Sequence, residues 1–283
     1  MTQTAGPTSP AIESDLATYR GEVTGYCYRM LGSVHDAEDA VQETMVRAWR
    51  AMDSFGGRSS VRSWLYRIAT NVCLDAIASR KRRATPLEMG GPSAPVQSSL
   101  GDPRPHEEWL EPLPWRGVAP SISDPAEQAA ERDNVRLAFV AALQPATREP
   151  LDPLDAEQQV LLRRYVQAFE NYDIDAFVAL LHEDATQSRP PFALWLQGAQ
   201  DLGDWMLGPG IGCRGSRVLR ASDANGCPAF AQYKPAADGD GFEPWGLHVL
   251  EITGGRIAGI TSFLDTRLFA RFGMPDRLEA DGR

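Results

Sequence analysis

Three stretches within the first 85 residues repeat apolar side chains at spacings of three and four, which is the period of an amphipathic helix. Gly32 ends the first stretch, and Ser33 with Asp36 forms a helix-capping pattern at the start of the second. The pattern predicts a compact three-helix domain over residues 10–85. The predicted helices are 12–31, 34–51 and 59–82. The side chains expected in the core are Ile12, Leu16, Tyr19, Val23, Tyr26, Cys27, Met30, Ala37, Ala40, Val41, Met45, Ala48, Trp49, Val61, Trp64, Leu65, Ile68, Val72 and Ala76.

Residues 86–123 have no helical or strand period and are rich in proline and glycine, which is typical of a linker. Trp109 and Trp115 lie within this stretch, and they either dock it on a neighbour or simply cover a domain edge. A further helix is predicted over 124–144. Three prolines then follow within ten residues and forbid its continuation.

The pattern changes again over residues 154–273. A helix is expected at 155–171, and Asp173 is placed to cap a second, short helix. Strand patterns follow, and the last two are joined by Thr253-Gly-Gly, a strong hairpin signal. The expected strands are 185–188, 216–221, 229–233, 247–252 and 257–263. Helices followed by a curved antiparallel sheet predict an α+β domain.

Length and composition agree with this division, since 283 residues with 43% hydrophobic content suit two globular domains. No apolar run approaches the roughly 20 residues that span a bilayer. The N-terminus also lacks the basic and then apolar pattern of a signal peptide. We therefore expect a cytoplasmic protein. The four cysteines form no CxxC pair, so no metal site is expected, and Cys27 and Cys73 are predicted to be small buried hydrophobes.

The net charge of −10 argues against indiscriminate nucleic-acid binding. Residues 1–85 nevertheless carry 11 Arg and Lys against 9 Asp and Glu, whereas the rest of the chain is acidic. The basic charge is concentrated at residues 80–83. Only the N-terminal domain is therefore suited to approach DNA.

An acidic row occupies one side of the second predicted helix, within the segment DAEDAVQET at 36–44. At helical spacing, such a row presents negative charge either to solvent or to a basic partner helix. A second motif follows in order: Phe55, then VRSWLYRIATN at 61–71, and a basic end at 80–83. The two motifs together resemble region two of extracytoplasmic-function (ECF) RNA polymerase sigma factors, over roughly residues 10–85.

This resemblance implies two partners, core RNA polymerase and promoter DNA. The first motif would bind polymerase, and the second would hold the melted minus-ten strand through a base pocket, a polar helix face and phosphate contacts. The implied polymerase-binding residues are Asp36, Asp39, Gln42 and Glu43. The implied DNA-binding residues are Phe55, Arg58, Arg62, Arg67, Asn71, Arg80, Lys81, Arg82 and Arg83.

The second domain resembles the SnoaL-like (polyketide-cyclase-like) fold, a cone-shaped α+β barrel. The matching features are the helix at 160–172, the run from Asp173 to Ala185, and the glycine hairpin before Phe263-Leu-Asp265. The resemblance implies a regulatory, ligand-sensing cavity, and no cofactor. His248 and Asp265 are candidates for a catalytic base and its orienting acid, although an enzyme is not expected. The candidate lining residues are Trp195, Arg214, Tyr233, Trp245, His248 and Asp265.

A working sigma factor of this type continues into a second helical domain that reads the upstream promoter element. Here the helix at 124–144 resembles only the start of that domain, sigma region four, before the prolines intervene. Three functions remain open. The chain initiates transcription with a C-terminal regulator, or is a small-molecule enzyme (cyclase, hydrolase or isomerase) with a vestigial sigma-like domain, or competes with intact sigma factors for polymerase.

Overall fold

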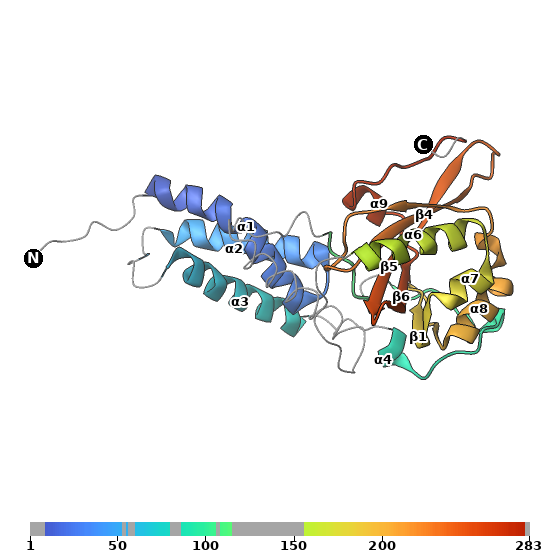
Figure 1. Ribbon diagram of the computed structural model, residues 1–283. Coiled ribbons are helices and arrows are strands. Elements are labelled where there is room, and N and C mark those ends of the chain that lie inside the picture. Colours follow the sequence, from blue (N-terminus) through green and yellow to red (C-terminus); the bar gives the residue numbers. More distant parts are fainter. Residues whose placement is uncertain are drawn as a thin grey trace, which may run out of the picture. The chain divides into compact units, whose positions relative to one another are not determined.

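The computed structural model describes residues 9–52, 55, 60–79, 86–105, 108–114 and 156–280, without the side chains of 9–17, 79 and 88. The chain divides into two compact units, which are described separately. The first unit contains three helices, drawn in blue to teal in Figure 1: α1 (Ser9–Leu31), α2 (Val34–Arg50) and α3 (Val61–Ser79). The three predicted helices are therefore confirmed. Residues 110–114 also belong to this unit.

The core of the helical unit forms where the apolar stripes of the three helices meet. Val23, Val41 and Leu65, one from each helix, are fully buried there. Cys27 and Cys73 are buried in the same cluster, as predicted. The expected burial of Trp49 was wrong, since its side chain is 64% exposed. The buried side of α2 runs through Ala37, Val41, Thr44 and Ala48. Trp49 is one position beyond this stripe, so its side chain points outward.

Part of the predicted linker packs against the second unit. Residues 86–105 include the short helices α4 (Pro86–Met89) and η2 (Gln97–Ser99). The backbone N–H of Ser93 donates to the carbonyl of Trp195 over 2.8 Å, and that of Arg104 donates to the carbonyl of Pro191 over 2.9 Å. This stretch is therefore part of a folded unit and not only a spacer. The helix predicted over 124–144 lies outside the described residues.

The second unit is a six-stranded sheet with three helices, at 156–170, 174–179 and 199–207, packed over one face, coloured yellow-green to red in Figure 1. Its helices are α6 (Ala156–Glu170), α7 (Ile174–Ala179), α8 (Ala199–Leu207), η5 (Pro209–Cys213) and α9 (Leu268–Arg271). Its strands are β1 (Leu181–Ser188), β2 (Trp195–Gln197), β3 (Arg217–Arg220), β4 (Ala229–Pro235), β5 (Phe242–Thr253) and β6 (Arg256–Phe263). The strand order is β2-β1-β6-β5-β4-β3.

The sheet is mixed, so the prediction of an antiparallel sheet was wrong in one place. β1 pairs with β6 in parallel, whereas all the other pairs are antiparallel. A parallel pair needs a long connection, and here β2 to β5 lie between the two partners in sequence. β2 was also missed, because three residues are too few to show a period.

Local signals set the ends of several elements as predicted. The Asp173 side chain accepts a hydrogen bond from the Ala176 N–H over 2.9 Å and caps α7. Gly254 and Gly255 both have positive φ, at 58° and 71°, and close the β5–β6 hairpin. Side chains from α6, α7 and α8 pack on Phe230, Leu250 and Ile260 of the sheet. This helix-covered face of the sheet contains the interior polar groups described below.

Candidate functional site

The outward side of α2 combines acidic and apolar side chains. Asp39, Gln42 and Glu43 are exposed, as expected for a binding surface. Val46 and Trp49 continue the same helical row and are also exposed. A tryptophan left in water on a packed helix is unusual and favours a site of partner contact. We call this row, from Asp39 to Trp49, the α2 face.

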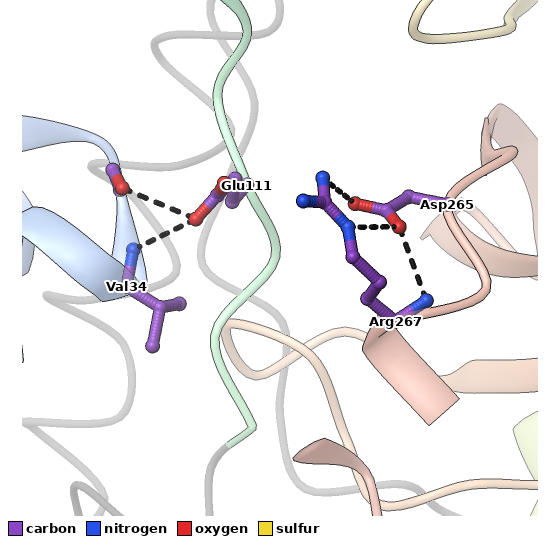
Figure 2. A network of polar contacts seen from close by, with 5 residues as sticks. Val34, Glu111, Asp265 and Arg267 are labelled. Carbon is purple, nitrogen blue, oxygen red and sulfur yellow. Dashed lines mark hydrogen bonds and ion pairs between the residues drawn. The ribbon is translucent and has the colours of Figure 1, made fainter. Parts of the chain in front are cut away.

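Asp36 does not belong to the α2 face, which corrects its place in the acidic row. Its side chain is buried, and its backbone N–H donates to the Ser33 hydroxyl over 3.3 Å in the helix cap. The first turn of α2 is covered by residues 110–114. The Glu111 carboxylate accepts hydrogen bonds from the Ser33 hydroxyl and the Val34 N–H, at 3.1 and 3.2 Å (Figure 2). A carboxylate at this position also complements the positive end of the helix dipole.

The same short segment is held by its backbone and by an apolar side chain. The Glu111 N–H donates to the Gly32 carbonyl over 3.1 Å, and the Tyr28 hydroxyl donates to the Glu111 carbonyl. Leu113 is buried in the helical core. From the sequence, Trp109 and Trp115 were expected either to dock this segment on a neighbour or to cover a domain edge. Trp109 is buried, but the polar anchors to the helical unit come from Glu111, and Trp115 lies outside the described residues.

The outward side of α3 presents Arg67 and Asn71, four residues apart and both exposed. Arg62 is also half exposed, but its guanidinium Nε is 2.8 Å from the buried Glu22 carboxylate. It also lies 5.4 Å from the centre of the Tyr66 ring. The ion pair raises the pKa of Arg62 and partly neutralises its charge. Arg67 and Asn71 are therefore the better-placed residues of this face, which we call the α3 face.

Phe55 was predicted to border a base pocket, but its ring packs on Trp64 with 4.8 Å between ring centres. It is partly buried and packs against the helical core. The remaining predicted DNA-binding residues, Arg58 and residues 80–83, lie outside the described residues.

The proposed His248–Asp265 pair does not form. His248 is buried. Its Nδ1 is 2.7 Å from the Tyr165 hydroxyl, and its Nε2 is 2.9 Å from the side-chain Oε1 of Gln232. Both ring nitrogens are thus occupied. Asp265 instead forms a two-pronged ion pair with Arg267, at 2.9 and 2.8 Å (Figure 2). Burial lowers the pKa of His248 to about 3, so the imidazole is neutral. A neutral histidine with both nitrogens bonded is poorly suited to act as a general base.

The other predicted lining residues do not converge on one point. The Trp195 indole N–H donates to the Gly90 carbonyl over 3.0 Å. Tyr233 packs on Phe269 of α9 and donates to the Pro275 carbonyl over 2.9 Å. Trp245 is exposed and lies 3.4 Å from the Lys234 ammonium, and Arg214 lies over the ring of Tyr172. Of the predicted set, only His248 is in the polar interior.

Sequence reasoning missed the residues that build this interior with His248. Tyr165 was part of a predicted helix. Gln232 extends the hydrogen-bond chain from His248 to Ser216, because its amide nitrogen lies 2.9 Å from the Ser216 hydroxyl. Arg189 is 7% exposed and lies 5.0 Å from the Trp205 ring centre. One signal was available: an arginine directly after a buried strand is unusual, because charged side chains are seldom buried without a partner.

Within the described ranges, no group of three or more histidine, cysteine or acidic residues is arranged to hold a metal ion. No helix of the described part of the chain is long and apolar enough to cross a bilayer.

Comparison with known proteins defines the class of each unit. Residues 16–83 match the Sigma-70 region 2 family model, and residues 162–260 match the SnoaL-like domain model. Along the whole chain, the ECF RNA polymerase sigma factor SigG of Mycobacterium tuberculosis is 39% identical over 312 residues, covering 92% of this chain and 83% of SigG. The chain therefore belongs to the family of ECF RNA polymerase sigma factors.

Two further proteins are similar over part or all of the chain. The ECF RNA polymerase sigma factor SigW of Bacillus subtilis is 48% identical over 63 residues, which are 22% of this chain and 34% of SigW. The crystal structure of the extracytoplasmic function sigma factor SigJ of Mycobacterium tuberculosis covers 94% of this chain and 99% of its own. Its TM-score is 0.49 and its identity is 21%.

Proposed function

We propose that this chain brings core RNA polymerase to promoters, with the α2 face binding polymerase and the α3 face binding the melted minus-ten strand. The observation that carries the proposal is that one packed helical unit presents both faces outward. Membership of the sigma factor family supports the partners, and the exposure of the named side chains supports their assignment. The domains drawn from the sequence, 10–85 and 154–273, are proposed as the functional ones, with residues 86–105 added to the second and 110–114 to the first.

The polymerase contact is proposed to join the acidic and apolar parts of the α2 face. Asp39 has no ion-pair partner among the described residues, so its charge is available to a basic partner. Glu43 forms an ion pair with Arg47 at 2.7 Å. Arg47 forms a second ion pair with Asp75 of α3 at 3.4 Å. Trp49 would provide apolar contact area, because interface energy concentrates in buried aromatic side chains. The charges would set orientation and association rate.

The DNA contact is proposed to use Arg67 and Asn71 for the separated strand. Arg62 would contribute only if DNA competes with Glu22 for its guanidinium. The basic residues 80–83 and Arg58 would contact phosphates, on the basis of charge alone, and this makes binding salt-dependent. Phe55 is left out of the stacking role, since its ring already packs on Trp64.

The C-terminal unit is proposed to regulate the helical unit in response to a small molecule. An enzyme is not favoured, because the relatives are sigma factors and both nitrogens of His248 are occupied. We also propose that sigma region four is missing. The alignment with SigG spans 312 residues, more than the 283 of this chain, so part of SigG has no counterpart here. Promoter selectivity should then rest on the minus-ten element.

Charge reversal on the α2 face tests the polymerase contact. The double substitution Asp39→Lys and Glu43→Lys should weaken binding to core polymerase by roughly tenfold or more, because like charges then face the partner. Binding is measured by co-purification and by titration at two salt concentrations. The matched control is Glu183→Lys with Asp184→Lys, which makes the same charge change at exposed positions of β1. Equal binding by both double variants would rule out the α2 face.

A further inference from the structure

A row of polar side chains crosses the helix-covered face of the sheet. His248 of β5 is paired with Ser262 of β6, and the hydrogen bond from the His248 Nε2–H to the Gln232 side-chain oxygen continues the row to β4. At the other end, the parallel pairing of Ser188 with Thr261 places the next residue, Arg189, beside Ser262. Alternation along β5 and β6 puts His248 on the same side as Leu250, and Ser262 on the same side as Ile260, both in the core beneath the helices.

Arg189 carries a positive charge into this interior without a counter-charge. It forms no ion pair or hydrogen bond through its side chain with any described residue, and its Nε is fully buried. Its guanidinium lies over the face of Trp205, 5.0 Å from the ring centre. Burial lowers the pKa of Arg189. A buried guanidinium with no carboxylate is costly, and proteins normally supply a partner.

The described groups around Arg189 include no carboxylate, and Lys234 is a second cation nearby, whose pKa is lowered by burial and then by the charge of Arg189. Burial raises the pKa of Tyr165, and it lowers that of His248, with the charge of Arg189 adding to the second effect. Gln232 and Ser216 carry no charge. Two more polar atoms on this face, the Ser262 hydroxyl and the side-chain Oε1 of Gln187, are buried without a hydrogen-bond partner among the described residues. Native interiors rarely leave such atoms unpaired.

Hydrogen bonds to water would satisfy Ser262 and Gln187 but would not balance the charge of Arg189. A ligand that balances this charge would therefore be an anion. A planar guanidinium is matched in shape by a carboxylate, which it binds through two parallel hydrogen bonds. An apolar surrounding also favours the smaller charge of a monocarboxylate over that of a doubly charged phosphate. Trp205, Phe177 and Leu250 offer apolar contacts to the rest of a ligand.

We propose that Arg189 and Ser262 form the anchor of a binding site for a small organic monocarboxylate with an apolar body. The carboxylate pairs with the Arg189 guanidinium and accepts from the Ser262 hydroxyl, while the apolar body packs among the side chains beneath α6 and α8. The proposal deepens the ligand-sensing role proposed above, and only its regulatory consequence rests on that role.

Binding to the full chain is tested by calorimetric titration with three carboxylates of increasing size, acetate, benzoate and octanoate. Each is compared with its neutral primary amide. At least one carboxylate should bind roughly tenfold or more tightly than its amide, because only the charged form compensates Arg189. Inorganic phosphate at the same concentration should bind more weakly than that carboxylate. Failure of all three acids to exceed their amides, or a preference for phosphate, would overturn the proposal.

The variant Arg189→Met separates binding from structure, because methionine keeps the length and the contact with Trp205 but has no charge. We expect it to lose the preference for carboxylate over amide and to melt at the same temperature as the parent or higher, since an unpaired buried charge is removed. Arg214→Met is the matched control, an exposed arginine over the Tyr172 ring, and should keep the preference. A marked fall in the melting temperature of Arg189→Met would indicate a structural role instead and contradict the site.

Cys213 supplies a second control, because it lies close enough to Arg189 to raise the pKa of the guanidinium against the larger, lowering effect of burial. If the Cys213 sulfur were the counter-charge, Cys213→Ser would lower the melting temperature and strengthen carboxylate binding, and the site would be a structural pair. Our proposal expects neither change. These measurements do not involve polymerase, so a carboxylate that binds without altering transcription would remove the regulatory role and leave the site intact.

Discussion

Replacing Leu65 with alanine is expected to lower the free energy of unfolding of the helical unit by about 2–5 kcal/mol. Leu65 is fully buried in the core cluster where α1, α2 and α3 meet. Its truncation removes apolar contact area and leaves a cavity, and a small three-helix unit has little stability in reserve. Both the α2 and α3 faces depend on this core for their geometry. The substitution should therefore weaken polymerase and DNA binding without touching either surface.

Leu74→Ala is the control, because it makes the same chemical change on the same helix at a side chain that is more than half exposed. Its effect on stability should stay within about 0.5 kcal/mol. Amide hydrogen exchange of peptides from α1 to α3 within the full chain gives both values. If the two variants were equally stable, the packing described for the helical unit would be incorrect.

Acidification is expected to destabilise the C-terminal unit through His248. The pKa of this buried imidazole is about 3 in the folded chain, against about 6.5 in an unfolded one. Above pH 6.5 the residue is neutral in both states and has no effect. Between pH 6.5 and 3 only the unfolded chain binds the proton, so stability falls as the pH falls. At pH 5 the loss relative to pH 7.5 is about 2 kcal/mol.

The substitution His248→Gln should remove this part of the pH dependence while keeping an amide that can bond to Tyr165 and Gln232. His182→Gln, at a partly exposed position on β1, should retain the full dependence. Denaturant unfolding of the C-terminal unit at pH 7.5, 6 and 5 provides the comparison. A parent and a His248→Gln variant with the same pH slope would show that the imidazole is not buried as described.

The elements that depend on neighbouring residues were predictable from the sequence. Ser33 and Asp173 cap the helices that follow them, and Gly254 with Gly255 closes the expected hairpin. In each case the determining contacts lie within a few residues, so composition and spacing contain the necessary information.

Features that depend on distant contacts were not predictable. The parallel pairing of β1 with β6 joins residues more than seventy positions apart, and it alone brings Arg189 beside Ser262. The burial of Asp36 was hidden because the covering residue, Glu111, comes from a segment with no periodic pattern. His248 was named as a candidate to line a cavity, but its partners, Tyr165 and Gln232, come from other elements and could not be identified by spacing.

Run-off transcription with purified core polymerase tests the central claim most directly. Core polymerase is supplied with the full chain and fragmented genomic DNA of the organism that encodes it, and the 5′ ends of the transcripts are sequenced. We predict chain-dependent transcripts whose start sites share a minus-ten element but no upstream element, and loss of these transcripts with Arg67→Glu. Binding to core polymerase without any such transcripts would instead show that the chain competes with intact sigma factors, and it would contradict a role in initiation.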